Sequence, residues 1–152
     1  MAGRIGFELV SPEKLLLSED VEMVVVPGGE GNFGVLPGHA LFISTVRPGV
    51  IEVYEGNRVS ERIFVSGGFA EVTPERCTVL ADEAMPVSAL DAAAIEARQR
   101  GLEGTAANLR ERVGRLTGDE RDAAASELRQ TEALLAIEAA KLVALSQAAV
   151  SH

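Results

Sequence analysis

A glycine-rich run is the first candidate for chemistry in this sequence. Residues 29–34 spell GEGNFG, which matches the G-x-G-x-x-G pattern of dinucleotide-binding loops. Such a loop needs a helix that opens at the third glycine, because the helix N-terminus faces the pyrophosphate. Pro37 follows Gly34 closely and would stop that helix almost at once. We therefore interpret the run as a connection between strands and predict no nucleotide site there.

Histidine, cysteine and paired acids form no recognisable catalytic constellation. His39 could be the general base of a small hydrolase or isomerase, but no serine or cysteine stands in a nucleophile motif. Cys77 is the single cysteine, which excludes an internal disulfide and a cysteine-rich zinc site, and it is expected to pack as a small apolar group. The acidic pairs at 19–20 and 82–83 are interpreted as solvated charge at strand edges. We predict no catalytic residue, no metal site and no cofactor.

Charge and composition exclude further classes of protein. The chain has 152 residues and a formal net charge of -9. No nucleic-acid partner is expected, because phosphate binding needs clustered Lys and Arg. Apolar residues make up 47%, too many for a disordered chain. No apolar run is long enough to cross a membrane, and the first residues lack the pattern of a signal peptide, so we expect a soluble intracellular protein without direct lipid insertion.

Composition changes sharply near residue 86. Every proline and every aromatic residue lies before that point, whereas 17 of the 22 alanines follow it. Proline punctuates turns, and alanine is the strongest helix former. This change predicts two domains, a β-rich domain at 1–86 and a helical domain at 87–152, and an α+β fold by overall content.

The first domain is expected to be all-β. Its apolar segments are rich in Val, Ile and Phe, several of them alternate with polar residues, and turn residues separate them every 8 to 12 positions or so. The predicted strands are 5–10, 15–17, 21–26, 33–36, 41–46, 50–54, 59–65, 69–73 and 77–81. No helical segment separates them, so we predict an antiparallel sandwich or barrel.

The second domain is expected to be an antiparallel two-helix hairpin. Ser88 is the predicted N-cap, with Asp91 three residues later. Gly118 and Asp119 are predicted to end one helix and cap the next. Apolar residues recur every seven positions in both helices and predict one narrow seam. The seam residues are Ile95, Leu102, Ala106, Leu109, Val113 and Leu116 in the first helix, and Leu128, Leu135, Leu142, Leu145 and Ala149 in the second.

Two motifs carry a resemblance to a known family. The run FGVLPGHA at 33–40, preceded by GEG at 29–31, resembles one signature of the epsilon subunit of F-type ATP synthases. The run FVSGGFAEV at 64–72, followed by VLAD at 79–82, resembles the second, and FELVSP at 7–12 also fits. The resemblance covers the whole chain, because the family has the same order of β domain and helical hairpin.

The resemblance implies a flattened sandwich of about ten strands and a non-catalytic role in the central stalk. Such a subunit binds the gamma subunit and the polar loops of the membrane c-ring, and so links proton-driven rotation to the catalytic head. By position, the gamma-facing residues would be Ser11, His39 and Ser44. The ring-facing residues would be Gly29, Glu30, Gly31, Asn32 and Phe33. Many relatives are acidic where this chain has Asn32, which weakens the expected charge complementarity.

The chain departs from the family in two further features, which concern nucleotide binding and inhibition of ATP hydrolysis. Some bacterial relatives bind ATP through an Ile or Leu followed by Asp, two variable residues, Arg and Ala. Leu90 and Asp91 fit this motif, but Ala94 replaces the arginine, so we predict no nucleotide binding and interpret Asp91 as a capping acid. In bacterial members the hairpin can extend to the alpha and beta subunits of the head and restrain ATP hydrolysis. The second helix here is net acidic, so we expect weak inhibition.

Alternatives remain beside this interpretation. The chain could be a free-standing β-sandwich adaptor whose hairpin docks onto a partner helix, or the small enzyme built on His39. Co-purification with a gamma subunit would separate the first alternative from the rotor subunit. If the resemblance holds, we expect the chain at the cytoplasmic face of the bacterial inner membrane, attached peripherally through the synthase.

Overall fold

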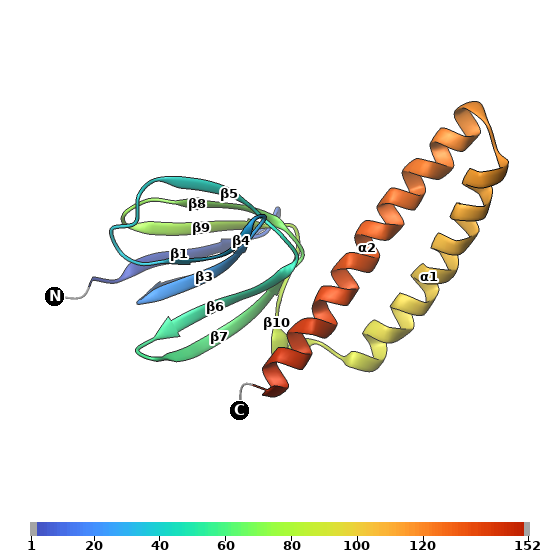
Figure 1. Ribbon diagram of the computed structural model, residues 1–152. Coiled ribbons are helices and arrows are strands. Elements are labelled where there is room, and N and C mark those ends of the chain that lie inside the picture. The colour runs from blue at the N-terminus through green and yellow to red at the C-terminus, as the bar shows by residue number, and fades with distance from the viewer. Residues whose placement is uncertain (1–2, 151–152) are drawn as a thin grey trace. The chain divides into compact units, whose positions relative to one another are not determined.

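The structure, a computed structural model, describes residues 3–150. It divides after Ala89 into two compact units, a β unit and a helical unit (Figure 1). A domain boundary at residue 86 stays a prediction that fragments can test. The two units are described separately below.

Ten strands form the β unit, which confirms the expected β sandwich (Figure 1). They are followed by a short 3-10 helix, η1 (Val87–Ala89), which contacts β7. The strands are β1 (Ile5–Val10), β2 (Leu15–Val21), β3 (Met23–Gly28), β4 (Gly31–Val35), β5 (Phe42–Val46), β6 (Gly49–Glu55), β7 (Arg58–Val65), β8 (Gly68–Val72), β9 (Arg76–Ala81) and β10 (Ala84–Pro86).

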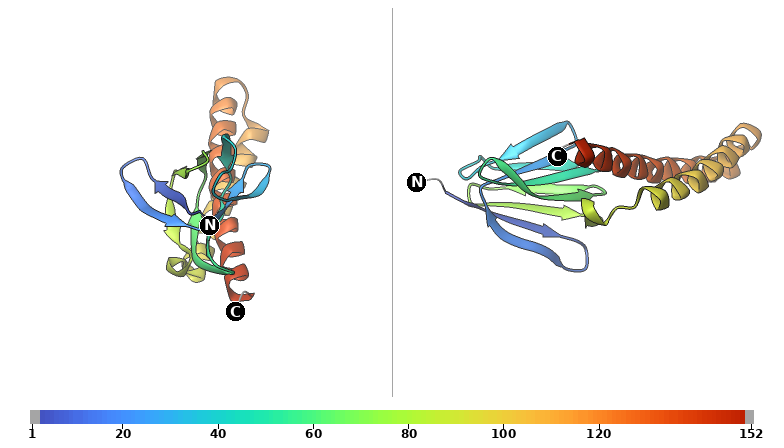
Figure 2. Two further views of the ribbon diagram at one scale, coloured as in Figure 1. Left: turned by 90° about the vertical axis from the view of Figure 1, so that its left-hand side faces the viewer. Right: turned by 90° about the horizontal axis from the view of Figure 1, so that it is seen from below.

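The sheet folds over on itself between β3 and β5. The strand order is β10-β7-β6-β3-β5-β8-β9-β1-β2, with β4 attached to β3. Only Gly28 and Val46 pair between β3 and β5, so the sheet can bend there and bring its two halves face to face. All neighbours are antiparallel except β1 and β9, which run parallel. Figure 2 shows the β1–β2 and β3–β4 hairpins projecting on opposite sides of this unit.

Alternation along the strands builds the core between the two halves. In β1, the side chains of Ile5, Phe7 and Leu9 are buried, while those between them are half-buried. β9 repeats the pattern with Cys77, Val79 and Ala81. Cys77 is fully buried in the apolar core, as predicted, and burial raises the pKa of its thiol to about 12.

Two parts of the sheet differ from the sequence prediction. β2 extends to Val21 rather than ending at Leu17, because the backbone of residues 18–21 pairs with β1 along the whole strand. Polar residues there suit an edge strand, where they protect the open side from further pairing. β10 was not predicted, since three residues carry no readable alternation. It exists because it pairs with β7.

The helical unit contains α1 (Ala92–Arg115) and α2 (Gly118–Val150). Asp91 is the N-cap of α1, and its Oδ1 accepts a hydrogen bond from the Ala93 N–H at 3.0 Å. The predicted capping by Ser88 is therefore wrong: Ser88 lies in η1, and the chain turns helical only after Asp91. Gly118 has the expected left-handed conformation (φ +62°), but it is the first residue of α2 and does not end α1, whose C-cap is Leu116. Asp119 lies inside the first turn of α2, not before it.

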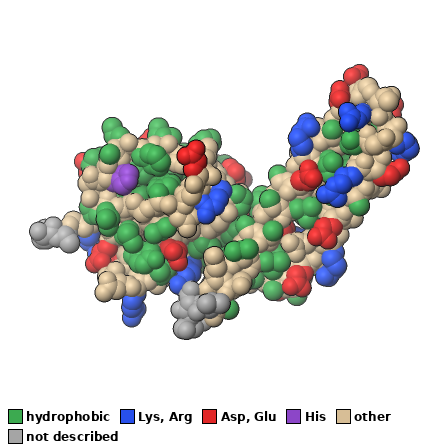
Figure 3. Space-filling model, in the orientation of Figure 1, with side chains coloured by type: hydrophobic (Ala, Val, Ile, Leu, Met, Phe, Trp, Pro, Cys, Tyr) green, Lys and Arg blue, Asp and Glu red, His purple; other side chains and the backbone are tan. Residues whose placement is uncertain are grey.

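Small and polar residues occupy the most buried line of α2. Ala124, Thr131 and Glu138 recur every seven positions and are buried, whereas Ala149 of the predicted seam is exposed. The predicted leucines flank this line and are half-buried; they are Leu128, Leu135, Leu142 and Leu145. Acidic and basic side chains are interspersed along the hairpin (Figure 3). Within residues 3–150, neither helix has a stretch both long and apolar enough to cross a bilayer.

Candidate interaction site

The β3–β4 turn presents the predicted ring-facing residues at one end of the sandwich. Gly28 pairs with Gly31, so Gly29 and Glu30 form the two-residue tip. Gly31 has φ +143°, a conformation that side chains rarely adopt, and a Cβ on Gly29 would collide with Thr45 Oγ1. The exposed Glu30 carries the only charge of the tip. The turn thus requires its glycines, and its acid faces outward.

Asn32 and Phe33 are engaged by β5 and the residue that follows it. Arg47 donates to Asn32 Oδ1 at 2.6 Å and to the Gly28 carbonyl at 2.5 Å. The Phe33 ring packs edge-on against Phe42, with centroids 5.2 Å apart, and lies partly buried against the core. The structure therefore brings the five predicted residues together, with Glu30 free to meet a partner and Phe33 anchoring the hairpin. Sequence reasoning missed Arg47, which only the fold places beside the turn.

The three residues predicted to face gamma do not form one cluster. Ser11 lies in the β1–β2 turn, where its hydroxyl donates to the Lys14 carbonyl. His39 follows the 36–38 loop, and its Nδ1 lies 2.8 Å from the Ala40 carbonyl oxygen. Ser44 is in β5 and pairs with the buried Ala70, so its side chain lies on the inner face of the sheet. In sequence, His39 is three residues and Ser44 two residues from Phe42. Ser11 follows β1, which is three strands from β5 in the strand order.

A row of apolar side chains, exposed except for the half-buried Val10, crosses the outer face of four strands. We call Phe69, Leu80, Val10 and Leu15 the outer apolar row, because each is the cross-strand partner of the next. Phe69 is 57% exposed, Leu80 52% and Leu15 55%. Ile43 on β5, 71% exposed, extends it on the same face. Exposed hydrophobic groups over the β unit are visible in Figure 3. A contiguous row of this kind is typical of a protein-binding surface.

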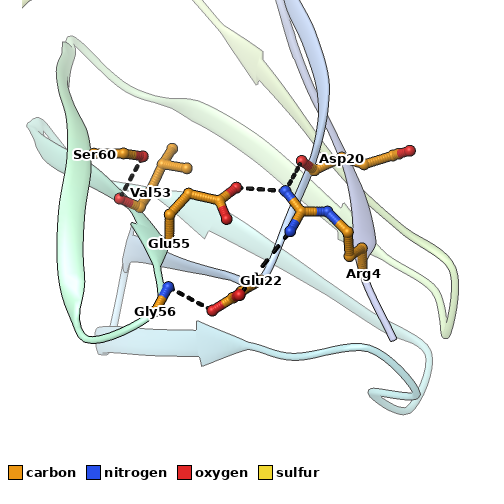
Figure 4. A network of polar contacts seen from close by, with 7 residues as sticks. All are labelled: Arg4, Asp20, Glu22, Val53, Glu55, Gly56 and Ser60. Atoms are coloured by element: carbon orange, nitrogen blue, oxygen red, sulfur yellow. Dashed lines mark hydrogen bonds and ion pairs between the residues drawn. The ribbon is translucent and has the colours of Figure 1, made fainter. Parts of the chain in front are cut away.

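A charged cluster joins residues beside β1 and β2 to the β6–β7 turn (Figure 4). Arg4 donates to the Asp20 carbonyl at 2.7 Å and forms an ion pair of 2.5 Å with Glu55. Glu22 accepts a hydrogen bond from the Gly56 N–H. These contacts connect the N-terminal segment and the β2–β3 junction with the β6–β7 turn, so they close the sandwich along its open side.

Glu19 departs from the interpretation as solvated charge. A hydrogen bond with Glu61 of β7, together with burial and the neighbouring charge of Glu61, raises the pKa of Glu19 to about 7. The pair at 82–83 is exposed, as expected. Sequence reasoning could not find the first pair, because Glu19 and Glu61 approach only when the sheet folds over.

The GEGNFG run and His39 both lie at connections between strands. The GEGNFG run continues into β4 and not into a helix, which confirms the interpretation as a strand connection. His39 contacts backbone and the Phe42 ring, 6.3 Å away between centroids. No group of three potential metal ligands gathers in the described residues. The recognisable features are therefore two exposed surfaces, the β3–β4 turn and the outer apolar row.

Comparison with known proteins agrees with this architecture. Residues 4–87 match the family model of the ATP synthase delta/epsilon chain β-sandwich domain. The sandwich is thus of the delta/epsilon type. Among curated relatives, the ATP synthase epsilon chain of Rhodospirillum rubrum is 52% identical over 137 residues, which cover 90% of this chain and 97% of the relative. That of Rhodospirillum centenum is 55% identical over 138 residues, which cover 89% and 92%. The chain therefore belongs to the family of ATP synthase epsilon chains.

A solved structure extends the similarity to both units. A chain in the OSCP/F1/c-ring structure of the Euglena gracilis mitochondrial ATP synthase superposes with a TM-score of 0.66 and 26% identity, over 95% of this chain and 83% of that one. The family resemblance noted in the sequence is confirmed. The chain is accordingly a non-catalytic subunit of an enzyme complex.

Proposed function

We propose that the chain is a central-stalk subunit that couples rotation of the c-ring to ATP synthesis in the head. The observation that carries this proposal is the 52% identity to an epsilon chain along nearly the whole length of that relative. The similarity to a chain solved together with F1 and a c-ring supports it. The subunit would lie at the cytoplasmic face of a bacterial inner membrane, attached through the complex. It needs no cofactor for this role.

The outer apolar row supports a contact with gamma. Its apolar groups would gain free energy when a partner removes them from water. Ser11 immediately follows Val10 of the row, so this proposed gamma contact lies at one end of it. His39 precedes β5, and Ser44 is next to Ile43 in β5, but the Ser44 side chain lies on the inner face and is not part of the row. Replacing Phe69 with Ser should reduce co-purification of a gamma subunit while the chain stays folded, because the ring is mostly exposed.

The β3–β4 turn supports a contact with the c-ring. Its tip is exposed, rigidly held and acidic at Glu30, which suits polar loops of opposite charge. The decisive variant is Glu30→Lys, with Glu13→Lys in the opposite hairpin as the matched control for net charge. In synthase reconstituted with each variant, Glu30→Lys should weaken attachment of the catalytic sector to membranes, more at low salt than at high salt.

Normal attachment and normal proton-coupled synthesis with Glu30→Lys at both salt concentrations would exclude the turn as a ring contact. Loss of attachment with Glu13→Lys as well would show a general effect of charge. Both variants are expected to fold normally, since exposed substitutions usually change stability by about 0.5 kcal/mol or less.

The helical unit supports weak regulation. Arg98 of α1 pairs with Glu138 of α2 at 2.7 Å, and Arg110 pairs with Glu132 at 3.5 Å, so opposite charges hold the hairpin closed. Extension toward the alpha and beta subunits of the head requires these pairs to separate. Because α2 carries six acidic and three basic residues, it is poorly suited to acidic surfaces of the head. We therefore expect little inhibition of ATP hydrolysis by this subunit.

A further inference from the structure

We propose that Arg47 is the positioning residue of the β3–β4 turn, and that it fixes where Glu30 is presented to the ring. The inference rests on the proposed ring contact. Arg47 follows β5 directly, and its guanidinium donates to acceptors on both sides of the tip. Nη1 donates to the Gly28 carbonyl at 2.5 Å, and Nη2 donates to Asn32 Oδ1 at 2.6 Å. One planar group thus bridges the end of β3 and the start of β4.

The backbone around Arg47 is attached to the same hairpin. The Arg47 N–H donates to the Pro27 carbonyl at 2.9 Å, and the Gly29 N–H donates to the Thr45 carbonyl at 2.9 Å. These bonds place the Arg47 Cα beside the base of the turn, so the side chain has only a short distance to span. The backbone bonds hold the base of the turn, and the guanidinium bonds to Gly28 and Asn32 hold the residues on either side of the tip.

Beyond the Gly29–Thr45 backbone bond and the Gly28–Val46 pairing, the β4 side of the hairpin has few other strand contacts. β4 pairs with β3 alone, and the hairpin projects from the β unit (Figure 2). Three of the four residues from 28 to 31 are glycines, which lose much conformational entropy when they are held in one conformation. A contact that restrains both strands at this point therefore limits how far the backbone of the tip can move, and so fixes the direction in which Glu30 points.

The planar fork is required, because the two acceptors lie on different strands. Lysine would keep the charge but presents one compact ammonium group in place of two parallel donors. Asn32 gives the guanidinium a neutral acceptor, so the restraint leaves the charge of Glu30 available.

The test uses the full chain reconstituted into synthase that lacks this subunit. The variants are Arg47→Met, Arg47→Lys and Asn32→Ala, with Glu30→Lys as the test of the contact itself. Arg58→Met is the control, because it removes the same charge at the start of β7, away from the β3–β4 turn. Two quantities are measured: hydrogen exchange of the Gly29 and Gly31 amides in the free chain, and affinity of the catalytic sector for membranes.

Arg47→Met and Arg47→Lys should both raise exchange in the turn and weaken attachment by about two- to fivefold, as expected for an exposed charged contact. Asn32→Ala should produce a smaller increase in exchange and a smaller loss of attachment. In the Asn32→Ala background, Arg47→Met should change both quantities less than it does in the parent chain. Arg58→Met should change neither quantity. Asn32→Ala keeps the inference testable if Arg47→Met does not fold.

Three results would overturn the inference. Full attachment with Arg47→Lys would show that charge alone matters. Normal attachment with Arg47→Met, together with weak attachment of Glu30→Lys, would reject the positioning role while the ring contact stands. Normal attachment with both Arg47→Met and Glu30→Lys would reject the ring contact itself.

Discussion

Glu19 and Glu61 show how folding can bring two like charges into contact. They lie on β2 and β7, which are far apart in the strand order but meet when the sandwich closes. A hydrogen bond between two carboxyl groups requires that one of them keep its proton. The pKa of Glu19, raised to about 7, means that the folded chain binds this proton more tightly than the unfolded chain, whose ordinary value is 4.5.

Glu19→Gln should remove this pH dependence. The stabilisation by the shared proton is complete below about pH 4.5 and is lost as the pH rises through 7. The Gln amide can donate the same hydrogen bond without titrating. The variant should therefore have a higher melting temperature than the parent chain at pH 8, and nearly the same one at pH 5.

The control for this measurement is Glu13→Gln, which removes an exposed charge in the β1–β2 turn. Glu13→Gln should shift the melting temperature equally at both pH values. If Glu19→Gln also shifted the melting temperature equally at pH 5 and pH 8, Glu19 and Glu61 would share no proton. Arg4 and Glu55, the other charged neighbours of Glu19, are the same in both chains, so the difference between the variants isolates Glu19.

At the scale of the element, α2 presents a polar residue where a hairpin usually presents leucine. Glu138 is 6% exposed and accepts hydrogen bonds from Arg98 at 2.7 Å and from Lys141 at 2.9 Å. Burial alone would raise the pKa of Glu138, but the two donors outweigh it and hold the pKa below its ordinary value of 4.5. The contribution of Glu138 to the free energy of unfolding is therefore present above pH 4.5 and is lost as the pH falls through the folded-state pKa.

Glu138→Gln should destabilise the helical hairpin by about 1–3 kcal/mol at pH 7, because two cations lose their common acceptor. The matched control is Glu132→Gln on the same helix, whose pair with Arg110 is exposed and should contribute less than about 1 kcal/mol. Thermal unfolding followed by helical circular dichroism measures both. Equal losses for the two variants would contradict the special role of Glu138.

The elements were predictable where a local signal decided them. The left-handed Gly118 and most strand cores follow from residue type and period, whereas the N-cap of α1 was predicted three residues too early, at Ser88. β10 and the end of β2 depend on pairing with distant strands, so no local signal marks them. The Ala124-Thr131-Glu138 line was hidden by the stronger leucine pattern beside it.

The candidate site was predictable only in part, for the same reason. The motif gave the turn from Gly29 to Phe33 as a continuous segment. Arg47 and the outer apolar row come from segments that only the sheet order brings together. The residues that surround a motif are therefore set by the tertiary fold, and a single sequence does not reveal them.

At the scale of the whole molecule, the β unit should fold without the helices. Its core lies between its own strands, and η1 adds the buried side chain of Val87. A fragment of residues 1–89 should show a cooperative thermal transition. A fragment of residues 1–86 should also fold but melt at a lower temperature, because it lacks Val87 and the η1 contact with β7.

Circular dichroism of both fragments measures this difference. An unfolded 1–89 fragment would contradict the independence of the β unit. Equal melting temperatures would support a domain that ends at residue 86, as composition alone predicted.

The parallel pairing of β1 with β9 has a consequence for synthesis on the ribosome. Gly6 leaves the ribosome early, yet its partner Arg76 is made 70 residues later, so β1 cannot be enclosed until β9 emerges. Until then the buried side chains of Ile5, Phe7 and Leu9 are exposed on the nascent chain, where chaperones can bind them. Translation of the 63 residues from 90 to 152 takes roughly 3 to 13 seconds at typical rates. The sandwich therefore has time to close around β1 while the hairpin is still being translated.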